Sequence, residues 1–198
     1  ADKTLLSIPG GRGLTGADLD TESAMLSAAL IDLGLEPGDR VSVQIDKGWM
    51  NVVLYLAVLR CGAVYLPLNS AYTNSEIEYF LTDAESKLHV CVADRLDHVE
   101  SLKGSIPGLQ VLTLDGETGT LIDVFEVAKA ANKSFSEVVI RASDDLASII
   151  YTSGTTGKPK GAMITHSNLV ANADMLTEAW NYSSADVLLH SLPLFHVH

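Results

Sequence analysis

The chain has 198 residues, of which 47% are hydrophobic and 19% charged, so it can bury the core of a folded globular domain. Its net charge of -12 is scattered along the sequence, which excludes the basic patch that nucleic-acid binding requires. The cysteines Cys61 and Cys91 form neither a disulfide framework nor a C-x-x-C pattern, so we expect a reducing compartment: the cytoplasm or, in a eukaryote, the mitochondrial matrix. No apolar stretch approaches the roughly 20 residues of a membrane span, and no signal peptide is visible.

The first half of the chain alternates helices and strands. Thr15 followed by Asp18 predicts a helix N-cap, and apolar residues keep helical spacing until Gly34 ends the helix. The next elements expected are a strand over 41–45, a helix over 49–59, a short buried strand over 63–66, a helix opened by Thr73, Asn74 or Ser75, and a strand over 88–92. This alternation predicts an α/β fold in which a mostly parallel sheet is covered by helices on both faces.

The second half is less regular between residues 112 and 143, where a helix over 121–131 is the only element predicted. The remaining expectations are a strand over 146–151, a Gly-rich loop, a strand over 162–165, a helix over 168–180 and a strand over 187–191. No repeat or linker marks a domain boundary. The chain stops at His198 directly after the apolar 187–191 segment and a turn, with no closing element for the sheet. We therefore expect residues 1–198 to be an incomplete amino-terminal domain.

The loop YTSGTTGKPKG, residues 151–161, carries the strongest chemical signal. Between two strand-like runs it gathers hydroxyls, glycines and ammonium groups: Thr152, Ser153, Gly154, Thr155, Thr156, Gly157, Lys158 and Lys160. Glycines let backbone N–H groups approach phosphoryl oxygens, hydroxyls donate further hydrogen bonds, and lysine supplies a compact positive charge. These groups predict a phosphate ligand. The competing interpretation is an ordinary polar surface loop, which rarely joins this density of donors to flanking buried strands.

The loop differs from a Walker A loop in both spacing and context. A Walker A loop has four residues between its glycines and a Ser or Thr after the lysine. Here only two residues separate Gly154 from Gly157, Pro159 follows Lys158, and a strand rather than a helix comes next. A P-loop NTPase is therefore excluded.

Residues 153–161 are similar to the signature loop of the adenylate-forming superfamily, which includes acyl-CoA synthetases, luciferases and the adenylation domains of peptide synthetases. Residues 58–68 resemble the upstream core motif of that superfamily, and residues 192–196 resemble its acyl-pocket motif. All three motifs occur in the family's order. The segments 65–73 and 195–198 most resemble malonyl-CoA synthetases.

The resemblance implies the amino-terminal part of the large domain of such an enzyme, using ATP, Mg²⁺ and coenzyme A. A carboxylic acid, with malonate or another short dicarboxylate favoured, would become an acyl-adenylate and then a thioester. The residues implied for ATP binding are Thr152, Ser153, Gly154, Thr155, Thr156, Gly157 and Lys160. Lys160 is the catalytic candidate, His196 and His198 are the candidates for contact with the acid, and Lys158 occupies a position that the family leaves variable.

Two alternatives remain open at this point. The chain could belong to an adenylating enzyme for another acyl chain or for loading a carrier protein, or it could be a nucleotide-binding module without catalysis. The resemblance also implies that the magnesium-binding glutamate, the ribose-binding aspartate, the hinge and the catalytic lysine of the carboxy-terminal domain follow residue 198. The oligomeric state is not indicated.

Two other patterns are weaker. Residues 11–16 satisfy the dinucleotide-binding pattern G-x-G-x-x-G, but Pro9 and Gly10 interrupt the preceding strand and Asp46 lies thirty residues after Gly16 rather than about 20. A turn between two short strands explains these glycines more simply. The group His190, His196 and His198 lacks a nearby carboxylate or cysteine, so no metal site is predicted.

Overall fold

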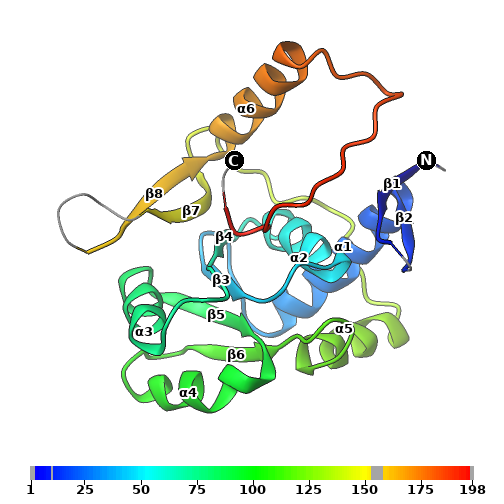
Figure 1. Ribbon diagram of the computed structural model, residues 1–198. Helices are drawn as coiled ribbons and strands as arrows, with labels where there is room; N and C mark the ends of the chain where they lie inside the picture. Colours follow the sequence, from blue (N-terminus) through cyan, green and yellow to red (C-terminus); the bar gives the residue numbers. More distant parts are fainter. Residues whose placement is uncertain (1–2, 10, 153–157, 197–198) are drawn as a thin grey trace.

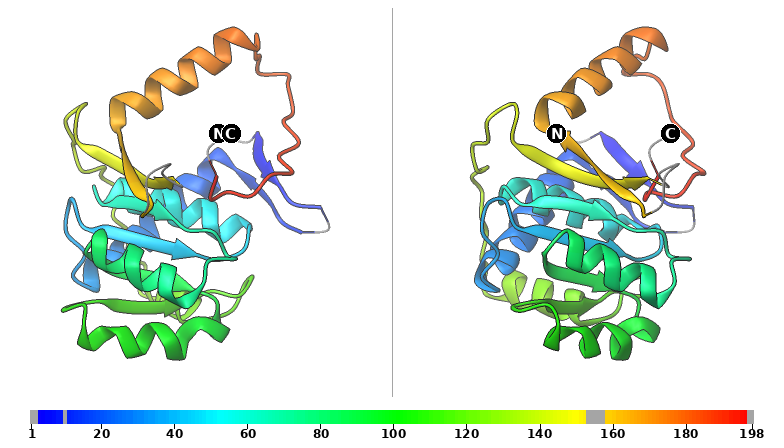
Figure 2. Two further views of the ribbon diagram at one scale, coloured as in Figure 1. Left: turned by 60° about the vertical axis from the view of Figure 1, so that its left-hand side comes forward. Right: turned by 90° about the vertical axis from the view of Figure 1, so that its left-hand side faces the viewer.

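The computed structural model describes residues 3–9, 11–152 and 158–196, and its centre is a six-stranded sheet with helices on both faces (Figures 1 and 2). The strand order is β6-β5-β3-β4-β7-β8. The first five strands are parallel, and β8 is antiparallel to β7. The α/β fold with a mostly parallel sheet is therefore confirmed.

The sheet strands are β3 (Arg40–Gln44), β4 (Val64–Pro67), β5 (Ser86–Cys91), β6 (Gln110–Thr113), β7 (Leu146–Thr152) and β8 (Lys160–Thr165). The helices are α1 (Gly16–Asp32), α2 (Trp49–Arg60), α3 (Asn74–Asp83), α4 (Leu96–Ser101), α5 (Thr120–Ala130) and α6 (His166–Ala179), with short 3-10 helices at Ala93–Arg95 and Leu102–Gly104. A separate hairpin pairs β1 (Thr4–Ser7) with β2 (Gly13–Thr15). None of the described helices is long and apolar enough to cross a membrane.

Threonine capping boxes open α1, α3 and α6. The N-caps are Thr15, Thr73 and Thr165, and in each the hydroxyl accepts from the backbone N–H three residues later, whose own side chain binds the cap N–H in return. Each box satisfies two backbone donors that the helix itself leaves unpaired. The first two helix starts agree with the sequence prediction, whereas α6 begins two residues earlier than predicted.

Gly62 ends α2 in the left-handed conformation, with a φ of 76°. The Gly62 N–H donates to the carbonyl of Leu59 and the Ala63 N–H donates to that of Val58, both at 3.0 Å, which is the Schellman pattern. A Cβ at Gly62 would lie 2.8 Å from Cγ1 of Val139, in the segment that connects α5 to β7. Conformation and close packing therefore both require glycine here.

Two hydrophobic cores lie on opposite faces of the sheet. One packs α1, α2 and α5 against strand residues such as Val41 and Val43, and the other packs α3 and α4 against strand residues such as Cys91 and Tyr151. Successive strand residues point to opposite faces. In β7, Ile149 and Tyr151 therefore point toward α3, while the alternate residues point to the other side.

Two parts of the sequence prediction need correction. The expected strand over 187–191 is irregular in the structure, and Val187 and Leu189 are 93% and 86% exposed, because no described strand pairs with this segment. After α6 the chain instead runs back toward the strand ends of the sheet (Figures 1 and 2). Strand β6 and helix α4, of four and six residues, were not predicted. Around residues 11–16 the antiparallel β1–β2 hairpin confirms a turn in place of a dinucleotide fold.

Candidate functional site

The carboxyl ends of β3, β4 and β7 meet at one edge of the sheet. From β3 the chain continues into α2 on one face, and from β4 it continues into α3 on the opposite face. Connections that leave adjacent strands in opposite directions create the crevice where ligands bind in open α/β sheets. This edge is therefore where a site is expected.

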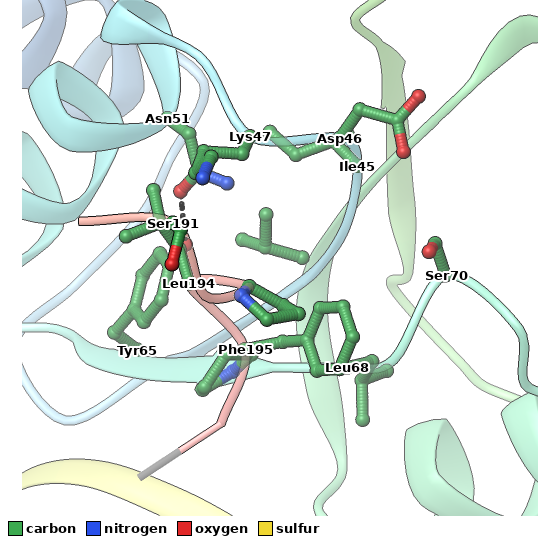
Figure 3. Close-up of a pocket in the computed structure, with 13 residues that line it drawn as sticks. Ile45, Asp46, Lys47, Asn51, Tyr65, Leu68, Ser70, Ser191, Leu194 and Phe195 are labelled. Atoms are coloured by element: carbon green, nitrogen blue, oxygen red, sulfur yellow. Dashed lines mark hydrogen bonds between the residues drawn. The ribbon is translucent and has the colours of Figure 1, made fainter. Parts of the chain in front are cut away.

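A cavity of about 290 Å³ occupies this crevice (Figure 3). Its walls come from the ends of β3 and β4, from α2 and from the segment that follows α6: Val43, Ile45, Asp46, Lys47, Asn51, Tyr65, Pro67, Leu68, Ser70, Ser191, Pro193, Leu194 and Phe195. The predicted acyl-pocket motif thus reaches the carboxyl edge of the sheet although it follows β4 by more than a hundred residues.

A second cavity of about 320 Å³ lies on the α2 side of β4 and β7. It shares several walls with the first and adds others: Asn51, Val52, Tyr55, Tyr65, Pro67, Ser148, Ile150, Leu169, Leu194, Phe195 and His196. The Tyr65 hydroxyl donates to Oδ1 of Asn51 at 2.7 Å, and Ser148 Oγ donates to the Tyr65 carbonyl at 2.7 Å. Burial raises the pKa of Tyr65, so the phenol stays a neutral donor.

Thr152 and Lys160 stand opposite each other where the signature loop leaves and rejoins the sheet. They are register partners in the antiparallel β7–β8 pair, and the Thr152 hydroxyl donates a hydrogen bond to the backbone carbonyl of Lys160 at 3.5 Å. Opposed residues of a strand pair share a face, and Thr152 lies on the same face of β7 as Ser148 and Ile150, which line the second cavity. Both exposed side chains therefore stand on the cavity side of β7. The candidates Ser153, Gly154, Thr155, Thr156 and Gly157 lie outside the described residues.

The histidine candidates are placed differently. His196 lines the second cavity, and the centroid of its ring is 4.9 Å from that of Phe195. His198 lies outside the described residues. The backbone carbonyl of His190 accepts a hydrogen bond from Lys47. Across the described part of the chain, no group of three His, Cys, Asp or Glu side chains could hold a metal ion.

Lys47 and Asn51 were not identified from the sequence. The Lys47 ammonium donates to the carbonyls of His190 at 3.1 Å and Leu192 at 3.3 Å, so it fixes the segment that carries the acyl-pocket motif. Asn51 lies between the two cavities and accepts from Tyr65. Neither residue belongs to a recognisable motif. Lys47 could not be found from local pattern, because its partners are backbone atoms about 140 residues away.

Comparison with known proteins gives consistent relatives. The chain is 33% identical over 207 residues to the oxalate–CoA ligase of Arabidopsis thaliana, covering 100% of this chain and 38% of the relative. It is 34% identical over 189 residues to the mitochondrial malonate–CoA ligase ACSF3 of Xenopus laevis, covering 93% of this chain and 32% of the relative. The chain thus spans about a third of the length of these two relatives.

Solved structures agree with these relatives. Apo MatB from Rhodopseudomonas palustris superposes with a TM-score of 0.90 and 39% identity, covering 98% of this chain and 38% of that one. The ATP-bound form of MatB gives a TM-score of 0.86 and 41% identity, covering 94% and 36%. The model of one family, described as AMP-binding enzyme, matches residues 1–198. With the fold, the motifs and the relatives in agreement, this chain belongs to the AMP-binding enzyme family.

Proposed function

We propose that the protein containing this chain is an ATP-dependent acid–CoA ligase. The carboxylate of the acid attacks the α-phosphorus of ATP and expels pyrophosphate, and the thiol of coenzyme A then attacks the acyl-adenylate and releases AMP. The observation that carries the proposal is the Thr152–Lys160 pair, which puts both ends of a donor-rich loop on the side of β7 that faces the cavity of His196.

This arrangement suits the first step. The expelled pyrophosphate gains negative charge as the bond to the α-phosphorus breaks, and an ammonium group beside it stabilises that charge. Lys160 is the group proposed for this role, with the Thr152 hydroxyl and the donors of residues 153–157 binding the phosphates. MatB, which shares the fold and has been solved with ATP bound, supports ATP as the nucleotide.

We propose malonate or another short dicarboxylate as the acid. Two of the relatives are named for dicarboxylates, oxalate and malonate. A second carboxylate buried without a partner would cost several kcal/mol, so the pocket needs donors for it. Tyr65, Asn51 and His196 line the second cavity, and His198 is a further proposed contact. A synthetase for another acid is the alternative.

Mg²⁺ would enter with ATP. The described residues contain no cluster of acidic side chains for it. The groups that we propose for the phosphates among the described residues are the Thr152 hydroxyl and the Lys160 ammonium.

We propose further that residues 1–198 form only the amino-terminal part of a larger domain. The relatives are more than twice as long, and α6 and the segment after it expose apolar side chains. A reducing compartment, the cytoplasm or the mitochondrial matrix, is proposed because Cys61 and Cys91 are both free and buried.

The proposal is tested by incubating the intact protein with ATP, coenzyme A and a panel of acids, and by measuring pyrophosphate and thioester separately. Thioester formed from malonate or oxalate in preference to propionate supports the ligase and its dicarboxylate preference. Preference for a long-chain acid removes the dicarboxylate assignment alone. Pyrophosphate exchange without thioester indicates carrier-protein loading, and ATP binding without either product reduces the protein to a nucleotide-binding module.

A further inference from the structure

Helix α3 contacts the sheet on both sides of the signature loop. We call Tyr151 and Thr152 the entry arm and residues 158–160 the exit arm of residues 153–157. Two α3 side chains reach these arms, Tyr79 and Asp83, which stand four residues apart and therefore on one face of the helix. In Figure 1, α3 lies beside the β7–β8 pair near the loop.

Tyr79 holds the exit arm through two contacts. Its hydroxyl donates to the backbone carbonyl of Pro159 at 2.9 Å, and its ring lies under the Lys158 ammonium, 5.2 Å from the ring centroid. An ammonium over an aromatic face is attracted by the ring's quadrupole. The Lys158 charge is therefore turned toward α3, which gives this lysine a structural partner away from the cavity side.

Asp83 holds the entry arm. The Tyr151 hydroxyl donates to Oδ2 of Asp83 at 2.6 Å. The Tyr151 ring also packs against Phe80 in the core under α3, with ring centroids 4.4 Å apart. Burial, reinforced by the hydrogen bond to the Asp83 carboxylate, raises the pKa of Tyr151. The phenol thus remains a neutral donor to a carboxylate, which is the stronger class of hydrogen bond.

The two arms are bound from behind the candidate site. Tyr151 faces α3, while its neighbour Thr152 and the opposed Lys160 face the cavity side. Tyr79 and Tyr151 also contact each other, with ring centroids 6.2 Å apart. Both ends of the loop are therefore bound to one helix, and the α3 side chains that bind them lie on the side of β7 away from the cavity.

We propose that Tyr79 and Asp83 are positioning residues that set the distance and orientation of the two arms, so that Thr152 and Lys160 meet the phosphates of ATP in one fixed geometry. The inference rests on the proposed ATP-dependent function. Positioning of this kind matters because phosphoryl-type chemistry depends on placement and electrostatics more than on covalent participation.

The test uses the intact enzyme and the Tyr79→Phe, Asp83→Ala and Asp83→Asn variants. Tyr79→Phe removes one donor and keeps the ring under Lys158. Asn at position 83 still accepts from Tyr151, so it should restore much of what Ala loses. We expect Tyr79→Phe and Asp83→Ala each to raise KM for ATP in pyrophosphate exchange by about two- to tenfold, the equivalent of one net hydrogen bond. KM for the acid should be unchanged.

The matched control is Tyr72→Phe, because Tyr72 packs on Phe80 in the same core but makes its contact away from the arms. Equal KM values for ATP in Tyr79→Phe, Asp83→Ala and wild type would overturn the proposal. So would a fall in kcat with unchanged KM values and a lowered Tm, since that result means only fewer folded molecules.

Hydrogen exchange separates this proposal from the function on which it rests. Exchange at the amides of Tyr151, Thr152 and Lys160 should speed up in Tyr79→Phe and Asp83→Ala but not in Tyr72→Phe, whether or not the enzyme turns over. If the wild type lacks pyrophosphate exchange with every acid, the proposed function fails, and faster amide exchange would still support the positioning contacts. Unchanged amide exchange would overturn them.

Discussion

Lys158 and Lys160 are separated by one residue, yet their surroundings differ. Lys160 stands at the first position of β8 opposite Thr152, on the cavity side, whereas the Lys158 ammonium lies over the Tyr79 ring on the α3 side. Composition alone does not separate them, because each is a cation in a loop of hydroxyls; in the sequence analysis only the family resemblance selected Lys160. The antiparallel register distinguishes them.

Replacing Lys160 by Ala should lower the adenylation rate by about 2 to 4 kcal/mol of transition-state stabilisation, roughly 30- to 1000-fold, because it removes charge where charge develops. Lys158→Ala is the matched control and should cost less than about tenfold. Pyrophosphate exchange at saturating ATP measures both. A Lys160→Ala rate within about threefold of wild type, or a larger loss in Lys158→Ala, would contradict the assignment.

His89 is fully buried in the α3-side layer, where its Nδ1 is 2.8 Å from the Ser42 hydroxyl of the neighbouring strand. Burial lowers the pKa of His89 to about 3, and the Ser42 contact opposes this weakly. The folded state therefore binds fewer protons than the unfolded state between about pH 3 and the ordinary value of 6.5. Stability is present above pH 6.5 and is lost as the pH falls through this window.

The His89→Asn variant should show a weaker pH dependence of stability than the wild type. Asn occupies the position of Nδ1 but does not titrate, so the slope of unfolding free energy against pH should flatten by up to about 1.4 kcal/mol per pH unit between pH 4 and 6. Urea midpoints at pH 4, 5, 6 and 7 measure this slope. Parallel curves for the two proteins would mean that His89 keeps its ordinary pKa in the folded state.

At the scale of elements, local signals correctly predicted the elements that depend on neighbours in sequence, whereas features that depend on long-range contacts were not predicted. The helices after Thr15 and Thr73 and the strands around Val43 and Val90 follow from caps and periodicity, which depend on neighbours in sequence. The 187–191 segment has a strand-like pattern but no described partner, so local pattern gave the wrong answer there.

The site shows the same division. The signature loop was recognisable as a contiguous motif, and the structure then placed Thr152 and Lys160 as partners. Tyr79, Asp83 and Lys47 were missed because their partners lie 68 to 145 residues away and are partly backbone atoms. Such contacts leave no pattern along a single sequence.

The end of α2 permits a matched test of packing against backbone strain. Gly62→Ala should destabilise the protein by about 2 to 4 kcal/mol, because alanine is strained at positive φ and its Cβ would overlap Val139. Gly34→Ala at the end of α1 has a φ of 84° but no atom within 4 Å of the added Cβ, so it should cost only about 1 to 2 kcal/mol. Urea unfolding measures both. Equal losses would show that the Val139 contact relaxes without cost.

The loop between β3 and α2 should influence the choice of acid through Lys47. Lys47→Met keeps the length of the side chain but removes both hydrogen bonds to the 190–192 segment, so KM for the acid should rise about three- to tenfold while KM for ATP changes little. Lys103→Met, which removes a surface ion pair with Glu100, is the control. Equal effects on both KM values would place Lys47 outside the acid pocket.

At the scale of the whole molecule, exposed apolar side chains concentrate in β8, in α6 and in the segment after it. They are Met163, Val170, Met175, Trp180, Tyr182, Val187, Leu188, Leu189 and Leu192. Large apolar side chains exposed in neighbouring elements are typical of a contact with further protein. Their exposure supports the proposal that the remaining part of the large domain covers this face.

Purified chain ending at His198 should therefore make no acyl-CoA from any acid in the panel, and it should self-associate through this face. Product analysis and light scattering, on material whose mass is verified, measure the two expectations. Turnover by this chain would contradict the proposal that residues 1–198 are only part of the catalytic unit. A monodisperse monomer would contradict the role given to the exposed face.

The position of β7 in the sheet also has a consequence for folding. Strands β3 to β6 come from residues 40–113, but β7 must pair with β4, and the Ser148–Tyr65 hydrogen bond that joins them closes a separation of 83 residues. Long closures are slow, so we expect β4 to remain an open edge until β7 arrives late. The strand that closes this edge also carries the signature loop. A nucleotide held by the loop would thus favour the closed sheet, and ATP would protect the newly made chain from edge-to-edge aggregation as well as serve as a substrate.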